Sequence, residues 1–235
     1  MTVAAPLARS THLGRERLAR GSVIPRHRHQ HGYIALVLAG GYREAGLSGR
    51  FELRAGDVAV HRSFETHLDC IGANGAEVLN LPLPPAVSLP DQFRINDPDL
   101  IARLAERDPY RAVEAFAPCD VVPAHDDWVD ELAAFVRHDH AGNLRQWARA
   151  QGFAPETLSR GFGRAFGVTP ARYRHEVRTQ RAIGLLTDTC LSLAEIAADC
   201  GFADQPHLTR AITQVTGCPP GQWRRSIPFK TSRSC

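Results

Sequence analysis

Between residues 21 and 83, apolar and polar residues alternate in short segments that glycines interrupt. The segments YIALVLAGG, FELRAGDVAVH and HLDCIGANGAEVLNLPLP are typical of strands joined by tight turns. A small antiparallel barrel or sandwich is therefore predicted for residues 1–90. The proline-rich stretch LPLPPAVSLPDQ that follows can form neither a helix nor a central strand, so it marks a boundary.

Beyond this boundary the hydrophobic pattern changes to a helical period. In DPDLIARLAERD, Asp97 and Pro98 stand where an N-cap and a first helical residue belong. In HDDWVDELAAFVRHDH, apolar residues recur at helical spacing; they are Trp128, Leu132, Phe135 and Val136. Residues 91–138 are predicted to be a helical connector. Its helices either pack on the preceding domain or pair with a second copy of the chain.

The last third of the chain contains the same pattern twice, in residues 143–174 and 192–224. Gly152 and Gly201 hold equivalent positions, and a phenylalanine follows each of them. Each copy predicts a helix, a glycine-centred turn and a second helix. This is the helix-turn-helix pattern, whose second helix enters the major groove of DNA.

Local signals in the second copy support these helix boundaries. Ser192 and Glu195 have the spacing of a capping box, in which each residue satisfies a backbone amide of the other. Gly201 suits the left-handed residue that often ends a helix, and Asp204 suits the N-cap of the next one. Two such units in tandem predict an all-α double helix-turn-helix domain over residues 139–235.

Charge separates the chain into an acidic and a basic part. Residues 141–235 carry 13 arginines and lysines against 6 acidic residues, whereas residues 1–140 carry 15 against 19. A basic part of this kind suggests a polyanionic partner. Nearly all the cations are arginines, whose planar fork suits phosphates and guanine edges. Together with the helix-turn-helix pattern, this charge predicts double-stranded DNA as the partner.

With its tandem repeat, and above all its segments IAADCGF and DQPHLTR, the chain resembles the AraC/XylS family of bacterial transcription regulators over residues 139–227. In that family the second helix of each unit reads bases from its exposed N-terminal positions. Carried over, the resemblance implies a set of DNA-reading residues: Glu156, Ser159, Arg160, Gln205, His207, Thr209 and Arg210. Arginine can bridge guanine, glutamine can bridge adenine, and threonine can contact the thymine methyl group. The alternative is that these residues touch only phosphates or cap helices.

Three histidines alternate in the segment PRHRHQHGY: His27, His29 and His31. Alternate side chains of an extended strand leave the same face, so these imidazoles are expected to form one row. His61 is expected to be solvated or locally bonded. Asp57 and Glu65 are the only nearby carboxylates found in the sequence, and both fit turns.

The N-terminal part also resembles the cupins, whose two motifs have characteristic spacings. The matching positions are Gly21, His27, His29, Tyr33 and Gly40 for the first motif, and Gly56 and His67 for the second. The resemblance implies metal ligands at His27, His29 and His67, and therefore one divalent transition metal ion, Zn²⁺, Ni²⁺ or Fe²⁺. Tyr33 stands where a glutamate ligand is usual. His31, Tyr33 and Cys70 are candidate effector-binding residues.

Three interpretations of the histidines stay open: a metal site, a pocket for an organic ligand, or a filled structural core. Together the parts predict a two-domain α+β regulator, with a cupin-like β-barrel, a helical connector and a double helix-turn-helix domain. A small-molecule or metal effector in the barrel would control promoter binding. A homodimer is a further expectation, as is contact with RNA polymerase if the protein activates transcription.

Two other functions compete with that of a regulator. One is a three-histidine cupin enzyme with an appended DNA-binding domain, which the lost carboxylate at Tyr33 disfavours, so no enzymatic activity is predicted. The other is a constitutive DNA binder whose barrel serves only dimerisation. The sequence shows neither a signal peptide nor a membrane-spanning segment, so a cytoplasmic location without a membrane partner is expected.

Overall fold

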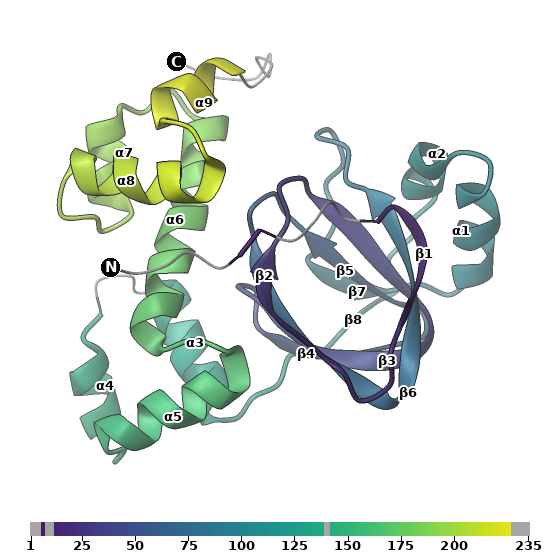
Figure 1. Cartoon of the computed structure of the whole chain (residues 1–235), viewed down its shortest axis with the longest axis horizontal. Coiled ribbons are helices and arrows are strands. Elements are labelled where there is room, and N and C mark those ends of the chain that lie inside the picture. The colour runs from purple at the N-terminus through teal and green to yellow at the C-terminus, as the bar shows by residue number, and fades with distance from the viewer. Residues whose placement is uncertain (1–5, 8–11, 139–141, 227–235) are drawn as a thin grey trace. The chain divides into compact units, whose positions relative to one another are not determined.

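The computed structural model describes residues 6–7, 12–138 and 142–226 (Figure 1). The chain divides near residue 130 into two compact units, each of which is described by itself. The N-terminal unit is built on an antiparallel sheet, and the C-terminal unit is all helical. None of the described helices is long and apolar enough to cross a membrane.

The strands of the N-terminal unit form one curved antiparallel sheet, which confirms the predicted antiparallel architecture. The strands are β1 (Gly14–Leu18), β2 (Val23–Arg28), β3 (Tyr33–Ala45), β4 (Arg50–Arg54), β5 (Asp57–His61), β6 (Thr66–Pro82), β7 (Gln92–Arg94) and β8 (Asp120–Val121). The long strands β3 and β6 pair with each other at the centre. One half of β6 pairs with β1 and the other half with β2, while β3 pairs in the same way with β5 and β4.

The two faces of this sheet carry separate apolar clusters. Neighbouring residues alternate between them: Leu36 belongs to one cluster and Val37 to the other, as do Val58 and Ala59. The first cluster is covered by α1 (Pro98–Ala105) and α2 (Pro109–Glu114), which lie beside the sheet in Figure 1. The second cluster lies on the inner side of the curve, where the polar groups considered below are also found.

The packing of α1 and α2 answers a question that the sequence left open, since both helices contribute buried residues to the cluster of the sheet. Asp97 caps α1, as predicted, and its carboxylate accepts a hydrogen bond from the Leu100 amide at 2.8 Å. The segment 91–138 is not purely a helical connector, because it begins with β7, which pairs with β5. A strand of three residues is too short to show an alternating pattern in the sequence.

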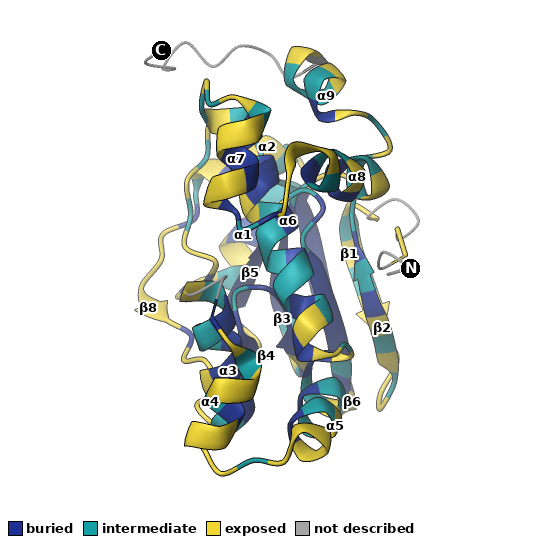
Figure 2. Cartoon of the chain, turned by 90° about the vertical axis from the view of Figure 1, so that its left-hand side faces the viewer, coloured by how far each residue is buried: buried dark blue, intermediate teal, exposed yellow. Residues whose placement is uncertain are grey.

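The C-terminal part of the chain consists of α3 (Trp128–His138), α4 (Leu144–Ala150), α5 (Pro155–Phe166), α6 (Pro170–Asp188), α7 (Leu193–Asp199), α8 (Gln205–Thr216) and α9 (Pro220–Ser226). Helix α6 joins the repeat formed by α4 and α5 to the repeat formed by α7 and α8. The helices turn buried faces toward one another and leave exposed faces outward (Figure 2). The largest fully buried side chains of this unit include Phe162, Tyr173, Leu186, Ile196 and Leu208.

The two repeats have the same turn geometry. Gly152 has a φ of 73° and Gly201 a φ of 70°, a left-handed conformation that glycine adopts without strain. In each turn the amide of the following phenylalanine donates to a carbonyl of the preceding helix, at 2.8 Å in the first copy and 2.9 Å in the second. The predicted capping box of Ser192 and Glu195 is present at the start of α7. Both predicted helix-turn-helix units are therefore present.

Candidate functional site

The helices that follow the two turns, α5 and α8, carry the residues predicted to read DNA. Leu158 and Leu208 are buried in the helical core and hold these helices in place. The side chains on the other faces reach the surface: Glu156, Arg160, Gln205 and Arg210 are exposed, while Ser159, Thr209 and His207 are half-buried. At the start of α8 the Asp204 carboxylate accepts a hydrogen bond from the His207 amide at 2.6 Å, which confirms the predicted cap.

Arg160 and Arg210 occupy equivalent positions in the two repeats. Each stands two residues beyond the buried leucine of its helix and is exposed. Since the leucine two residues before it is buried in each case, each arginine lies away from the buried side of its helix. Each helix-turn-helix repeat therefore has one arginine side chain at the surface of its second helix.

The imidazole of His207 takes part in packing as well as facing the surface. Its ring meets the edge of Phe202 with centroids 5.1 Å apart, and it stacks on His175 of α6 at 6.1 Å. Burial lowers the pKa of His175 from its usual value of 6.5, and the nearby Arg172 lowers it further. The ring of His207 thus helps to dock α8 on α6, a contact that the sequence did not indicate.

Several arginines of the C-terminal part stabilise its fold. Arg172 pairs with Glu176 at 2.9 Å, Arg181 pairs with Asp199 at 2.8 Å, and Arg224 donates to a backbone carbonyl at 2.7 Å. Others remain at the surface: Arg145, Arg149, Arg160, Arg210 and Arg225. The basic charge that the sequence showed is therefore divided between structural ion pairs and an exposed set.

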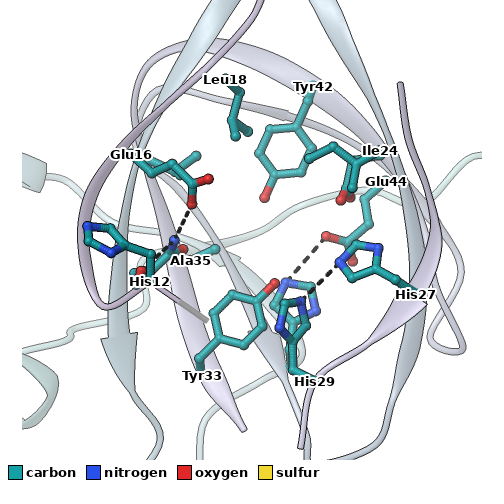
Figure 3. A pocket seen from close by; sticks show the side chains of 14 residues that line it. His12, Glu16, Leu18, Ile24, His27, His29, Tyr33, Ala35, Tyr42 and Glu44 are labelled. Carbon is teal, nitrogen blue, oxygen red and sulfur yellow. Dashed lines mark hydrogen bonds and ion pairs between the residues drawn. The ribbon is translucent and has the colours of Figure 1, made fainter. Parts of the chain in front are cut away.

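In the N-terminal unit, His27, His29 and His67 come together as predicted. His27 on β2 is the register partner of His67 on β6, and His29 follows directly after β2. Their potential ligand atoms all lie within 4.8 Å of one another. The Nε2 atoms of His27 and His29 are 3.0 Å apart, a contact drawn as a dashed line in Figure 3, and the two rings meet at an interplanar angle of 79°.

One hydrogen bond fixes how His27 is protonated. Its Nδ1 lies 2.9 Å from the carbonyl oxygen of Pro25. Because a carbonyl only accepts, Nδ1 carries the proton and donates, which leaves a lone pair on Nε2. A backbone carbonyl that orients an imidazole in this way is the usual outer partner of a metal-binding histidine.

His61 also belongs to this cluster, so the expectation of a solvated or locally bonded histidine was wrong. It is 4% exposed, its ring centroid lies 4.4 Å from that of His67, and it stacks on Tyr33 at 4.5 Å. His61 ends β5, whose residues are all buried, and pairs with Tyr33 across the sheet. The apolar segment before it, DVAV, was the signal of a central strand.

Two buried carboxyl groups that the sequence did not reveal lie beside the histidines. Glu44 and Asp69 face each other in the register of β3 and β6 and are 2% and 6% exposed. A carboxylate oxygen of Glu44 lies 3.5 Å from Nε2 of His61, and one of Asp69 lies 3.7 Å from Nε2 of His67. Naming Asp57 and Glu65 as the only nearby carboxylates was therefore wrong.

Burial shifts the pKa values of these groups toward their neutral forms. It lowers the pKa of His29 to about 4 and that of His61 to about 3, and it lowers the pKa of His67 well below 6.5. It also raises the pKa of Asp69 to about 7 and that of Glu44 well above its usual value. At neutral pH the imidazoles are therefore unprotonated and can offer lone pairs.

Of the three predicted effector-binding residues, only Tyr33 reaches the interior. Its hydroxyl lies 3.4 Å from Nε2 of His67, and burial raises its pKa well above 10. His31 is exposed in the turn after β2, because that strand ends at Arg28 and the alternation stops there. Cys70 follows Asp69 on β6 and is not among the residues that line the cavity.

A cavity of about 250 Å³ in the N-terminal unit is lined by His27, His29 and His61 together with the carboxyl groups of Glu44 and Asp69. Figure 3 shows the hydroxyl groups of Tyr33 and Tyr42 and the carboxylate of Glu16 directed into it. Its polar lining consists of His12, Glu16, His27, His29, Tyr33, Tyr42, Glu44, His61, Asp69 and Asn80. This volume is several times the roughly 30 Å³ of a water molecule, so the cavity can hold a small polar molecule.

Comparisons with known proteins identify the C-terminal part. Residues 147–226 match the family described as Helix-turn-helix domain. The HTH-type transcriptional regulator GbdR of Pseudomonas aeruginosa is 35% identical over 72 residues, which cover 31% of this chain and 20% of that protein. The virulence regulon transcriptional activator VirF of Yersinia enterocolitica is 32% identical over 97 residues, covering 40% and 36%. The chain thus spans about a third or less of these two curated relatives.

Among solved structures, apo ToxT from Vibrio cholerae aligns with a TM-score of 0.46 and 10% identity, covering 94% of this chain and 100% of that one.

The C-terminal part of the chain is a tandem helix-turn-helix domain. These matches agree with the resemblance to the AraC/XylS family that the sequence shows in this part. The resemblance of the N-terminal unit to the cupins stays a prediction.

Proposed function

We propose that the protein is a sequence-specific DNA-binding transcription regulator whose helices α5 and α8 enter the major groove of promoter DNA. The observation that carries this proposal is the repeated turn, which presents Arg160 and Arg210 at equivalent exposed positions. The matched relatives, which are transcriptional regulators, support it as well. The exposed arginines of the same part would contact phosphates and position the reading helices.

The exposed residues of the two helices have the chemistry of base recognition. Arg160 and Arg210 can each donate two hydrogen bonds to O6 and N7 of guanine. Gln205, at the first position of α8, can bridge N6 and N7 of adenine. Ser159 and Thr209 can bond to a base edge, and Thr209 can also contact a thymine methyl group.

The proposal extends to the N-terminal unit, whose cavity would take a small-molecule effector or one divalent transition metal ion and thereby control promoter binding. The support is chemical: unprotonated imidazoles, two tyrosine hydroxyls and buried carboxyl groups surround one space. An occupant changes DNA binding only to the extent that it binds the DNA-competent and DNA-incompetent states with different affinity.

Selection of bound sequences from a pool of random DNA duplexes tests the DNA-reading proposal. With the full chain, the expected result is enrichment of two short sequence blocks, one for each reading helix. The double variant Arg160→Ala, Arg210→Ala should lose this enrichment. The matched control Arg103→Ala removes an exposed arginine from α1 in the other unit and should retain it. Equal recovery of all sequences by the unmodified chain would overturn the proposal.

A further inference from the structure

The three imidazoles of His27, His29 and His67 already have the spacing of ligands to a single ion. A tetrahedral ion bound at about 2.0–2.1 Å to each nitrogen would place neighbouring ligand nitrogens roughly 3.3 Å apart. The Nε2 atoms of His27 and His29 are 3.0 Å apart, and the whole set lies within 4.8 Å. Small side-chain adjustments would therefore bring all three into coordination.

The carboxylate usually supplied from position 33 in such a site is absent, because Tyr33 stands there. Asp69 offers one from the neighbouring strand. It lies two residues beyond His67 on β6, so both side chains leave the same face. One of its oxygens is 3.7 Å from Nε2 of His67.

Unsatisfied polar atoms mark the same place. In the described part of the chain, Oδ1 of Asp69, Oε2 of Glu44 and Nδ1 of His67 are buried without a hydrogen-bond partner. Leaving such atoms unpaired costs about 1–3 kcal/mol each, and more when the group is charged. A coordinated cation would compensate the oxygens directly, since carboxylates are ligands for divalent ions.

The charge of the cavity selects the class of ligand. Glu16, Glu44 and Asp69 line it, whereas the described lining residues include no lysine or arginine. An anionic ligand would be repelled by these carboxyl groups when they are ionised, and no lysine or arginine among the described lining residues would compensate the repulsion. A bound cation favours the ionised form of these carboxyl groups, which burial alone disfavours, and gains their attraction.

From this geometry we infer that Asp69 is the anionic fourth ligand of a divalent transition metal site that also includes His27, His29 and His67. Tyr33 lies beside this site through its contact with His67, and Glu44 supplies a second carboxylate close by. The inference rests on the metal alternative within the proposed function and assigns its ligands.

Cobalt(II) titration of the full chain tests the assignment, after treatment with a chelator and removal of the chelator. Calorimetry gives the stoichiometry and affinity, and visible absorption reports the number and type of ligands. The unmodified chain should bind one cobalt ion. Asp69→Asn should weaken binding by at least about tenfold and change the spectrum, because the anionic ligand is lost. Glu52→Gln, which removes an exposed carboxylate of β4 that does not line the cavity, is the matched control and should leave both unchanged.

Three outcomes would overturn the inference. Cobalt binding by Asp69→Asn with unchanged affinity and spectrum would show that Asp69 is not a ligand. Loss of binding in Glu44→Gln but not in Asp69→Asn would assign the carboxylate to Glu44. If the unmodified chain binds neither cobalt nor zinc, the histidines do not form a metal site.

Circular dichroism verifies that each variant is folded. If Asp69→Asn does not fold, Asp69→Glu takes its place in the test. This variant should bind cobalt with an altered visible spectrum. An unaltered spectrum would contradict the assignment of Asp69 as a ligand. Metal binding is measured without DNA. An absence of metal binding would therefore not contradict the DNA-reading proposal. In the same way, an absence of sequence enrichment in the DNA selection would not contradict the metal site.

Discussion

His175 of α6 couples the second reading helix to the rest of its unit. Its ring stacks on His207 and lies against Phe202, the residue that follows the turn glycine. Burial and the neighbouring Arg172 lower its pKa in the folded state below 6.5. Protonation of this one imidazole would place a positive charge between α6 and α8.

The expected consequence is a loss of stability in acid. In the pH interval just below 6.5, the unfolded chain binds a proton at position 175 that the folded chain does not bind. The free energy of unfolding therefore falls as pH is lowered through 6.5, and His175→Gln should reduce this dependence. Urea unfolding above and below pH 6.5 measures it, with His31→Gln, at an exposed position, as control. Equal pH dependence in His175→Gln and the unmodified chain would contradict the prediction.

Single residues also show what the sequence could and could not reveal. The convergence of His27, His29 and His67 was predictable from their spacing, and Asp69 could have been found from its alternation with His67. Glu44 could not, because irregularities in the pairing of β3 with β6 interrupt the alternation between Val37 and Tyr42. Its burial depends on which strand lies opposite, and that is a tertiary property.

At the scale of elements, the two turns provide an internal comparison. A Cβ atom added at Gly152 would meet nothing within 4 Å, whereas one at Gly201 would lie 3.2 Å from the guanidinium of Arg178. Both glycines have a left-handed backbone, so any other residue is strained at either position.

Gly152→Ala should therefore cost about 1–2 kcal/mol of stability, the usual penalty for a left-handed non-glycine residue. Gly201→Ala should cost more, because the Arg178 side chain must also move. Chemical denaturation of the full chain, followed by helical circular dichroism, measures both. A larger loss in Gly152→Ala than in Gly201→Ala would show that the local space around the turns has been misjudged.

The helices of the C-terminal part were predictable because their signals are local. The capping box of Ser192 and Glu195, the cap at Asp204 and the turn at Gly201 each depend on residues within one turn of a helix. The short strand β7 and the packing of α1 and α2 on the sheet depend on distant partners, and the sequence left them undetermined.

At the scale of the whole molecule, two units divide the chemistry: one carries a histidine-lined cavity and the other two helix-turn-helix elements. Replacing both His27 and His67 with alanine should abolish any effect of added zinc on DNA affinity. Binding of metal-free protein to DNA should stay unchanged. Fluorescence anisotropy with a selected duplex measures both. An unaltered zinc effect in the double variant would show that zinc acts elsewhere.

In the proposed function, the two repeats read bases at different places in one DNA site. The most direct test of this base reading is the base preference of Arg160→Ala and Arg210→Ala, each measured on duplexes substituted at every position of the selected site. Each variant should lose about 1–3 kcal/mol of binding free energy and relax the preference at one position, and the two positions should differ. A uniform loss on all sequences would contradict this base reading and assign both arginines to phosphate contacts.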